Sequence, residues 1–187
     1  MRHPLESMNP KSQKNLFIIL LSLTILIMLV MNIIGAPLTT ASAPAGIVSF
    51  ELAFSPGNAR QMLSSWDQEA LLKASFIQGL DFLFPLVYST SLGLGCLLAA
   101  RSLCDKGKPL PGLGRITAWG LVLGALFDYI ENIALLAVLF GSPRSPFPEI
   151  AGVCALIKFT IIFFTIAYMI YGLIMKLLVK TLTKPAT

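Results

Sequence analysis

Charged residues are scarce in this sequence: they make up 12% of its 187 residues, against roughly 25% in soluble domains. Hydrophobic residues make up 56%, and the mean hydropathy is +0.80. This composition is typical of an integral membrane protein and excludes a soluble globular domain. The net charge of +5 does not indicate a nucleic-acid partner, because the basic residues are spread over short loops and do not alternate with aromatic residues.

Histidine and cysteine are also rare, which excludes several kinds of site. The single histidine, His3, is close to the N-terminus, so neither a Ser-His-Asp nor a Cys-His catalytic centre can be built inside the chain. The three cysteines, Cys96, Cys104 and Cys154, are too few for a disulfide framework and lack CxxC spacing. The scarcity therefore excludes zinc and His-rich transition-metal sites, and we expect neither a cofactor nor a metal; a metal, if one binds, would be a hard cation held by oxygen ligands.

Long runs with little charge are what the sequence contains instead. The first, residues 15–34, is long enough to cross ~30 Å of hydrocarbon as a helix. Three more runs, 74–100, 116–140 and 151–175, are each interrupted by only one or two charged residues. We predict an all-α integral membrane protein, a four-transmembrane-helix bundle that forms a single domain over residues 1–187.

The first run also resembles a signal peptide at its C-terminal flank, where Ala41, Ser42 and Ala43 form a small-residue pattern. The run is longer than the roughly 7–15 residues of a signal-peptide apolar region, and Pro44 would directly follow the cut. We therefore expect an uncleaved span.

The basic residues predict the orientation of the four spans. Ten flank the chain termini and the loop between the second and third runs, whereas Arg60, Lys73 and Arg144 flank the other side. Because basic residues are enriched on the cytoplasmic side, we expect both termini in the cytoplasm. The ten are Arg2, Lys11, Lys14, Arg101, Lys106, Lys108, Arg115, Lys176, Lys180 and Lys184.

The loop 35–73 is the only long one and is predicted to lie outside. Ser55 followed by Pro56 is typical of a helix N-terminus. Leu63, Trp66, Ala70 and Lys73 follow at helical spacing, so we expect an amphipathic helix at the outer surface that can run on into the second span. Trp66 suits the membrane interface. Either this loop is a connector lying on the membrane, or it is a lid over a cavity.

Polar residues interrupt the runs at a common depth. At 1.5 Å per residue, most of those in the predicted spans fall within ~10 Å of one another, in the outer half of the bilayer. Ionisable residues at this depth are candidates for a binding site by default. The candidates for binding a ligand or ion are Asn32, Gln78, Asp81, Tyr88, Asp128, Glu131, Asn132 and Lys158.

The charges in this layer do not balance. Each charged residue at a helix centre costs about 2.5–3.5 kcal/mol, yet Asp81, Asp128 and Glu131 face a single basic residue, Lys158. At least one carboxylate should therefore carry a proton, unless a cation, a water molecule or a ligand amine occupies the site. Pro85 should loosen the backbone hydrogen bonds near Asp81 and widen a cavity there.

Glycine pairs predict close helix packing. Gly120 and Gly124 form a GxxxG pair in the third run, and such small residues let helices approach closely. The GLG string at 93–95 is the same kind of feature, because it follows no strand and so does not match a nucleotide-binding motif. We expect the lipid bilayer as a partner, together with a second copy of the chain or another membrane protein.

Three strings, SFELAFSPGNARQMLSSWDQEALL, GLDFLFPLVYS and FDYIEN, resemble a family of small bacterial four-span membrane proteins. The resemblance covers most of the chain from Ile47 onward. It implies a four-helix membrane bundle in a bacterial inner (plasma) membrane, but no reaction. More distantly, acidic residues inside four spans are similar in style to the ligand sites of sterol-isomerase-like and sigma-2-like proteins. No motif matches those residue by residue, so nothing is carried over from them.

Three functions remain open on the sequence. In the first, the polar layer binds a cation, a proton or a small amphipathic ligand from the outer side, as part of a binding or transport system. In the second, the layer is structural, and the chain is an accessory subunit of a membrane complex. In the third, Asp128 or Glu131 performs acid–base chemistry on a lipid. The sequence leans away from the enzyme because it holds no nucleophile motif.

Overall fold

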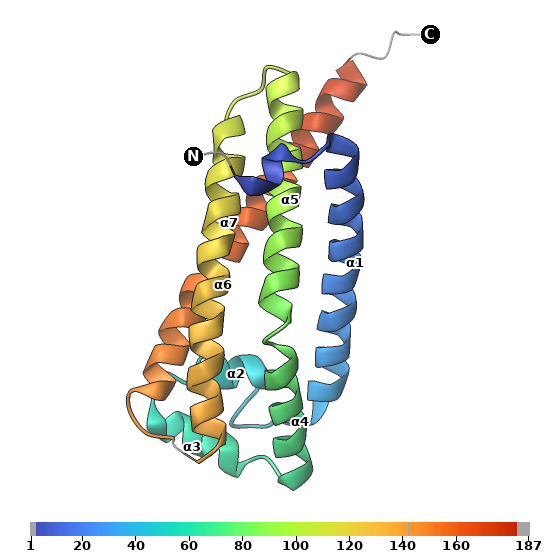
Figure 1. Ribbon diagram of the computed structural model, residues 1–187. Coiled ribbons are helices and arrows are strands. Elements are labelled where there is room, and N and C mark those ends of the chain that lie inside the picture. Colours follow the sequence, from blue (N-terminus) through green and yellow to red (C-terminus); the bar gives the residue numbers. More distant parts are fainter. Residues whose placement is uncertain (1–2, 142, 183–187) are drawn as a thin grey trace.

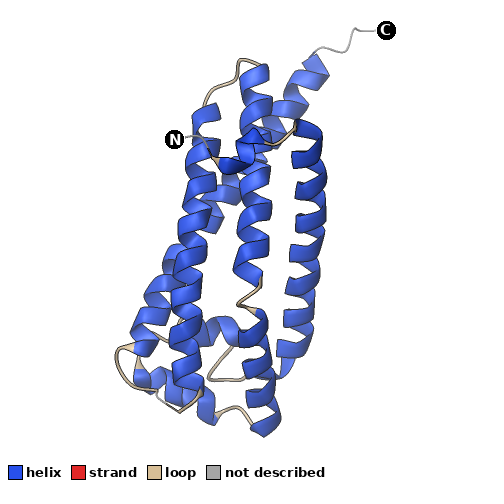
Figure 2. Ribbon diagram, in the orientation of Figure 1, coloured by secondary structure: helices blue, strands red, loops and turns tan. Residues whose placement is uncertain are grey.

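The computed structural model describes residues 3–141 and 143–182, the last four of them by their backbone alone. Every regular element in this part of the chain is a helix (Figure 2). Four helices are long and apolar enough to cross a membrane: Pro10–Leu38, Phe84–Asp105, Pro111–Leu139 and Phe147–Leu178. The structure confirms the predicted all-α bundle of four candidate membrane spans.

The bundle is built from α1 (Pro10–Gly35), α5 (Phe84–Asp105), α6 (Pro111–Leu139) and α7 (Phe147–Leu182). α5 packs against the other three, and α6 packs closely against α7 (Figure 1). α1 is the most peripheral of the four, because only 6% of the residues in its most apolar 18-residue stretch are buried inside the protein. All four begin with a proline at their first or second position, where the missing N–H removes no hydrogen bond within the helix itself.

The second predicted span differs from the structure because it is two helices. α4 (Gln68–Leu80) ends just before Asp81, and α5 begins at Phe84. Pro85 explains the break, because a proline has no N–H to donate to the carbonyl four residues earlier, which is that of Asp81. The predicted loosening at this point is therefore a break in the helix.

The loop between the first two spans folds into η2 (Ala36–Leu38), α2 (Ile47–Glu51) and α3 (Pro56–Ser64). α3 begins as predicted: the Ser55 hydroxyl accepts a hydrogen bond from the amide of Asn58 at 3.2 Å. It does not run on into the second span. Asp67 caps a new helix, α4, by accepting a 2.8 Å bond from the amide of Ala70.

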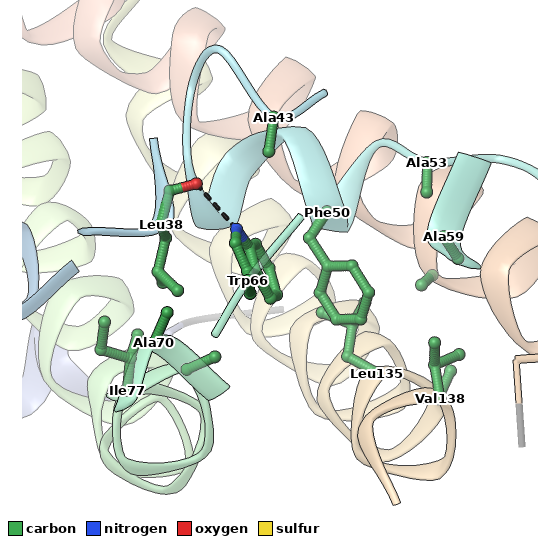
Figure 3. Packing of buried hydrophobic residues seen from close by; sticks show 13 residues of the cluster. Leu38, Ala43, Phe50, Ala53, Ala59, Trp66, Ala70, Ile77, Leu135 and Val138 are labelled. Carbon is green, nitrogen blue, oxygen red and sulfur yellow. Dashed lines mark hydrogen bonds between the residues drawn. The ribbon is translucent and has the colours of Figure 1, made fainter. Parts of the chain in front are cut away.

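The expected place of Trp66 at the membrane interface is wrong, because its ring is 5% exposed. The indole N–H donates a 2.9 Å hydrogen bond to the carbonyl of Leu38, and the ring packs edge-on against Phe50 (Figure 3). Around them a buried apolar cluster joins the loop to α4, α6 and α7, so the loop is a packed cap on the bundle. Its members are Leu38, Ala43, Phe50, Ala53, Ala59, Trp66, Ala70, Ala74, Ile77, Ala134, Leu135, Val138 and Ala151.

At the opposite end, η1 (Pro4–Ser7) lies against the start of α6. Arg115 Nε donates a 2.7 Å hydrogen bond to Oε1 of Glu6, and this bond lowers the pKa of the Glu6 carboxyl. The His3 ring packs edge-on against Trp119, with centroids 4.9 Å apart. We call this end of the bundle, which also holds the connection between α5 and α6 and the last turns of α7, the termini end (Figure 1).

The first and last described residues lie at the same end of the bundle (Figure 1), as an even number of spans requires. Which side of a membrane this end faces stays a prediction. Of the basic residues that predicted it, Arg2 and Lys184 lie outside the described residues, and the side chain of Lys180 is not described.

Candidate functional site

A buried lysine, Lys158, lies among three buried carboxylates. Its Nζ is 2.9 Å from Oε1 of Glu131, 3.1 Å from Oδ1 of Asp128 and 3.4 Å from Oε2 of Glu51. It donates hydrogen bonds to the first two. All four residues are at most 7% exposed. We call these four residues the ionic cluster.

Close packing of α6 on α7 brings two of the carboxylates to the lysine. Asp128 and Glu131 are three residues apart on α6 and therefore share a face. One turn before Asp128, Gly124 faces Ile161 of α7, and a Cβ at Gly124 would lie at an ordinary van der Waals distance of 3.6 Å from that side chain. Both glycines of the GxxxG pair thus face α7, but a Cβ at either position would fit, so the predicted role of the pair in close packing stays a prediction.

The third carboxylate comes from the loop between α1 and α4 (residues 36–67), which we call the loop cap. Glu51 is the last residue of α2, a five-residue helix that follows Gly46, whose φ of 58° is disfavoured for other residues. The neighbouring Phe50 is 1% exposed and packs on Trp66, which fixes α2 against the bundle. Sequence reasoning missed Glu51 as a site residue, because it assigned residues 35–73 to the outside.

The carboxylates differ in how well they are hydrogen-bonded. Both oxygens of Asp128 have partners, because the Tyr88 hydroxyl donates to Oδ2 at 2.8 Å while Lys158 donates to Oδ1. By contrast, Oε2 of Glu131 is buried without a hydrogen-bond partner among the described residues. Oε2 of Glu51 is likewise without one, since its contact with Lys158 is within ion-pair distance but lacks hydrogen-bond geometry.

Beside the cluster, two amides close the break between α4 and α5. Asn132 Nδ2 donates a 2.9 Å hydrogen bond to the carbonyl of Asp81, the group that Pro85 leaves without a helical donor. Gln78 Nε2 donates a 2.6 Å bond to Oδ1 of Asn132. Gln78 and Asn132 are at most 1% exposed. The first of these two hydrogen bonds satisfies a backbone carbonyl that is buried inside the bundle.

The side chain of Asp81 adds a fourth carboxylate to the local charge. It is 6% exposed and interacts electrostatically with Asp128, Lys158 and Glu51. If all four carboxylates were ionised, four negative charges would face one positive charge, an excess of three. The sequence predicted an excess of two, because it did not include Glu51.

The structure brings together seven of the eight candidate residues and leaves out Asn32. Asn32 is exposed on α1, whereas the other seven are all buried. They are Gln78, Asp81, Tyr88, Asp128, Glu131, Asn132 and Lys158.

The arrangement does not suit a metal ion. In the described part of the chain, no group of three or more His, Cys, Asp or Glu residues is placed to hold one. The ammonium of Lys158 lies among the carboxylates, where a cation would need to bind, and would repel it. What the site can do is exchange protons, because its carboxylates outnumber its only ammonium.

Comparison of the chain with protein-family models, with curated proteins and with solved structures found no match.

Proposed function

We propose that this multi-pass membrane protein binds and releases protons at the ionic cluster and Asp81, as a component of a proton-linked binding or transport system. The observation that supports the proposal is the excess of carboxylates over ammonium inside the bundle, at residues that are at most 7% exposed. An uncompensated charge in such surroundings costs several kcal/mol. Protons are the ligands that remove the excess without displacing Lys158.

The two carboxylate oxygens without hydrogen-bond partners mark where protons reside. A buried carboxylate oxygen without a donor is costly. Protonation turns such a carboxylate into a neutral group with a donor of its own. Oε2 of Glu131 and Oε2 of Glu51 are the two such oxygens in the cluster.

The path for the proton runs from the α2–α3 end, which the basic residues predict to be outer. Glu51 belongs to the loop cap, whereas the other cluster residues belong to α6 and α7. It is the residue through which the loop cap reaches the cluster. Four spans are few for a complete transporter with two halves, so a second copy or a partner subunit should complete the path.

A structural role is the second candidate, because Lys158 connects α2, α6 and α7 through one ammonium. Such a network would fix the register of the helices without any exchange of protons. In that case the chain would be an accessory subunit of a membrane complex.

A proton count separates the two candidates. Purified protein in weakly buffered detergent is shifted from alkaline to neutral pH, and the protons bound are measured with a pH indicator for the wild type and for Glu51→Gln, Asp81→Asn and Glu131→Gln. If the proposal holds, the wild type takes up protons and each variant takes up fewer. Equal uptake in all four proteins would contradict it. Adding Na⁺, Ca²⁺ or Mg²⁺ at fixed pH should release no protons, and a stoichiometric release would show a cation site instead.

A further inference from the structure

A second site, unrelated to the ionic cluster, lies in the half of the bundle nearest the termini. It is a cavity of about 510 Å³ between α1, α5 and α7. Its walls are largely apolar, including Phe17 of α1, Leu92 and Leu98 of α5 and Ile166 of α7. We call this cavity the inner groove.

Small residues in its walls let α1, α5 and α7 approach closely around the inner groove. The Cβ that Gly95 lacks would meet the end of the Met169 side chain and would lie 2.9 Å from Phe17. The Cβ that Gly172 lacks would lie 2.7 Å from that of Ala99. Both glycines line the groove. A larger residue at Gly95 would displace the end of the Met169 side chain, and one at Gly172 would press on Ala99 and push α7 away from α5.

Two lysines lie where the groove reaches the termini end. Lys14 is in the second turn of α1 and Lys176 is near the end of α7, and both line the groove. Within the described part of the chain, no acidic side chain lines the groove and neither lysine forms an ion pair. The groove is therefore apolar along its length and positively charged at one end.

The length of the groove matches one leaflet of a membrane. Its lining runs from Leu92 to Ser102 on α5 and from Ile166 to Lys176 on α7. Ten residues of helix cover about 15 Å at 1.5 Å per residue. This is half of a hydrocarbon core of ~30 Å. An acyl chain in the groove would thus end near the middle of the bilayer, with its headgroup at the lysines.

We propose that the inner groove binds an anionic phospholipid of the leaflet at the termini end. An acyl chain lies along the apolar walls, and the headgroup phosphate lies between Lys14 and Lys176. The charge at the mouth selects the anionic headgroup, because basic residues at this level attract anionic lipids. This proposal goes beyond proton binding and does not depend on it.

Spin-labelled lipids test the proposal. The full-length protein is reconstituted into phosphatidylcholine vesicles with a trace of spin-labelled phosphatidylglycerol or phosphatidylcholine, and the motionally restricted fraction of each label is measured. We expect the wild type to prefer phosphatidylglycerol. The double variant Lys14→Gln/Lys176→Gln should lower this preference at least about fivefold, the factor equivalent to about 1 kcal/mol for one basic residue near a lipid surface. The matched control Lys11→Gln/Lys108→Gln removes two charges outside the groove and should retain most of the preference.

Two further measurements distinguish binding of the acyl chain from binding of the headgroup. Leu98→Trp, which enlarges a side chain of the groove wall, should lower the restricted fraction of both labels. Excess inorganic phosphate should displace neither label, and displacement would show a free-phosphate site in place of a lipid site. Equal preference in the two double variants, or an unchanged restricted fraction in Leu98→Trp, would overturn the proposal.

Discussion

Oε2 of Glu51 lies 3.4 Å from Nζ of Lys158, although Glu51 belongs to the loop after the first span and Lys158 to the last span. The contact joins the loop cap to the ionic cluster inside the bundle. Because Lys158 also contacts Asp128 and Glu131, the balance of charge in the cluster depends on a residue outside the four spans.

Removing the only ammonium of the cluster should strongly destabilise the protein. Lys158→Met leaves the buried carboxylates without a counter-charge, and breaking a buried ion pair from one side costs about 3–5 kcal/mol. Unfolding in detergent at neutral pH measures the loss, which should shrink in acid as protons replace the missing ammonium. The control Lys73→Met breaks the 2.6 Å pair with the exposed Glu69 and should cost less than about 1 kcal/mol. A loss that is no larger for Lys158→Met would contradict the account.

Replacing Glu51 by a neutral residue, in contrast, should not destabilise the protein. Glu51→Gln keeps the shape of the side chain and removes one of the excess carboxyl groups, so we expect a stability within about 1 kcal/mol of the wild type or above it. The same change should rescue part of the loss in Lys158→Met, with a coupling energy of about 0.5–3 kcal/mol in a double-mutant cycle. Additive effects would mean that the two groups do not interact.

The hydrogen bond from Asn132 to the carbonyl of Asp81 can be tested through Pro85. Asn132→Ala leaves that buried carbonyl without a donor, which should cost about 1–3 kcal/mol. Adding Pro85→Ala supplies an amide N–H at the position from which a continuous helix would bond the same carbonyl. The double variant should therefore unfold at a higher temperature than Asn132→Ala alone. If it is no more stable, the break between α4 and α5 has another cause.

The pair of Glu6 and Arg115 should contribute a pH-dependent part of the stability. The hydrogen bond from Arg115 lowers the pKa of Glu6 in the folded protein. The pair therefore contributes its full stabilisation at any pH above the ordinary pKa of a glutamate. This stabilisation is lost as the pH falls through the lowered pKa of Glu6 in the folded protein. Glu6→Gln should therefore lower Tm slightly at neutral pH, since the pair is largely solvent-exposed, and the difference from the wild type should vanish in acid. A difference that persists in acid would contradict this reading.

The sequence predicted the four spans and most of the ionic cluster, because charges interrupting an apolar run have few stable positions. Asp128, Glu131 and Lys158 had to face the interior and one another, and they do. Asn32 could not be placed in the same way. α1 is apolar on all sides, so no pattern fixed its rotation, and Asn32 is exposed.

The loop cap was harder to predict because hydropathy assigns a loop to the outside without saying how it folds. Glu51 follows a phenylalanine and precedes Leu52 in the string SFELAF. A lone carboxylate in such a string is the one signal that could have drawn attention to it. Trp66 was misplaced for a related reason: an amphipathic ring suits the interface or a buried site with a hydrogen-bond acceptor, and only the fold supplies the Leu38 carbonyl.

Infrared spectroscopy of the wild type and of Glu131→Gln in lipid at neutral pH tests the central claim most directly. A protonated carboxyl group has a carbonyl stretch that an ionised carboxylate lacks, so protons held in the cluster are visible. The account predicts such a band in the wild type, its loss on raising the pH, and its reduction or shift in Glu131→Gln. A wild-type spectrum with no protonated carboxyl at neutral pH would mean that the cluster tolerates its excess negative charge, and the proposed proton site would be wrong.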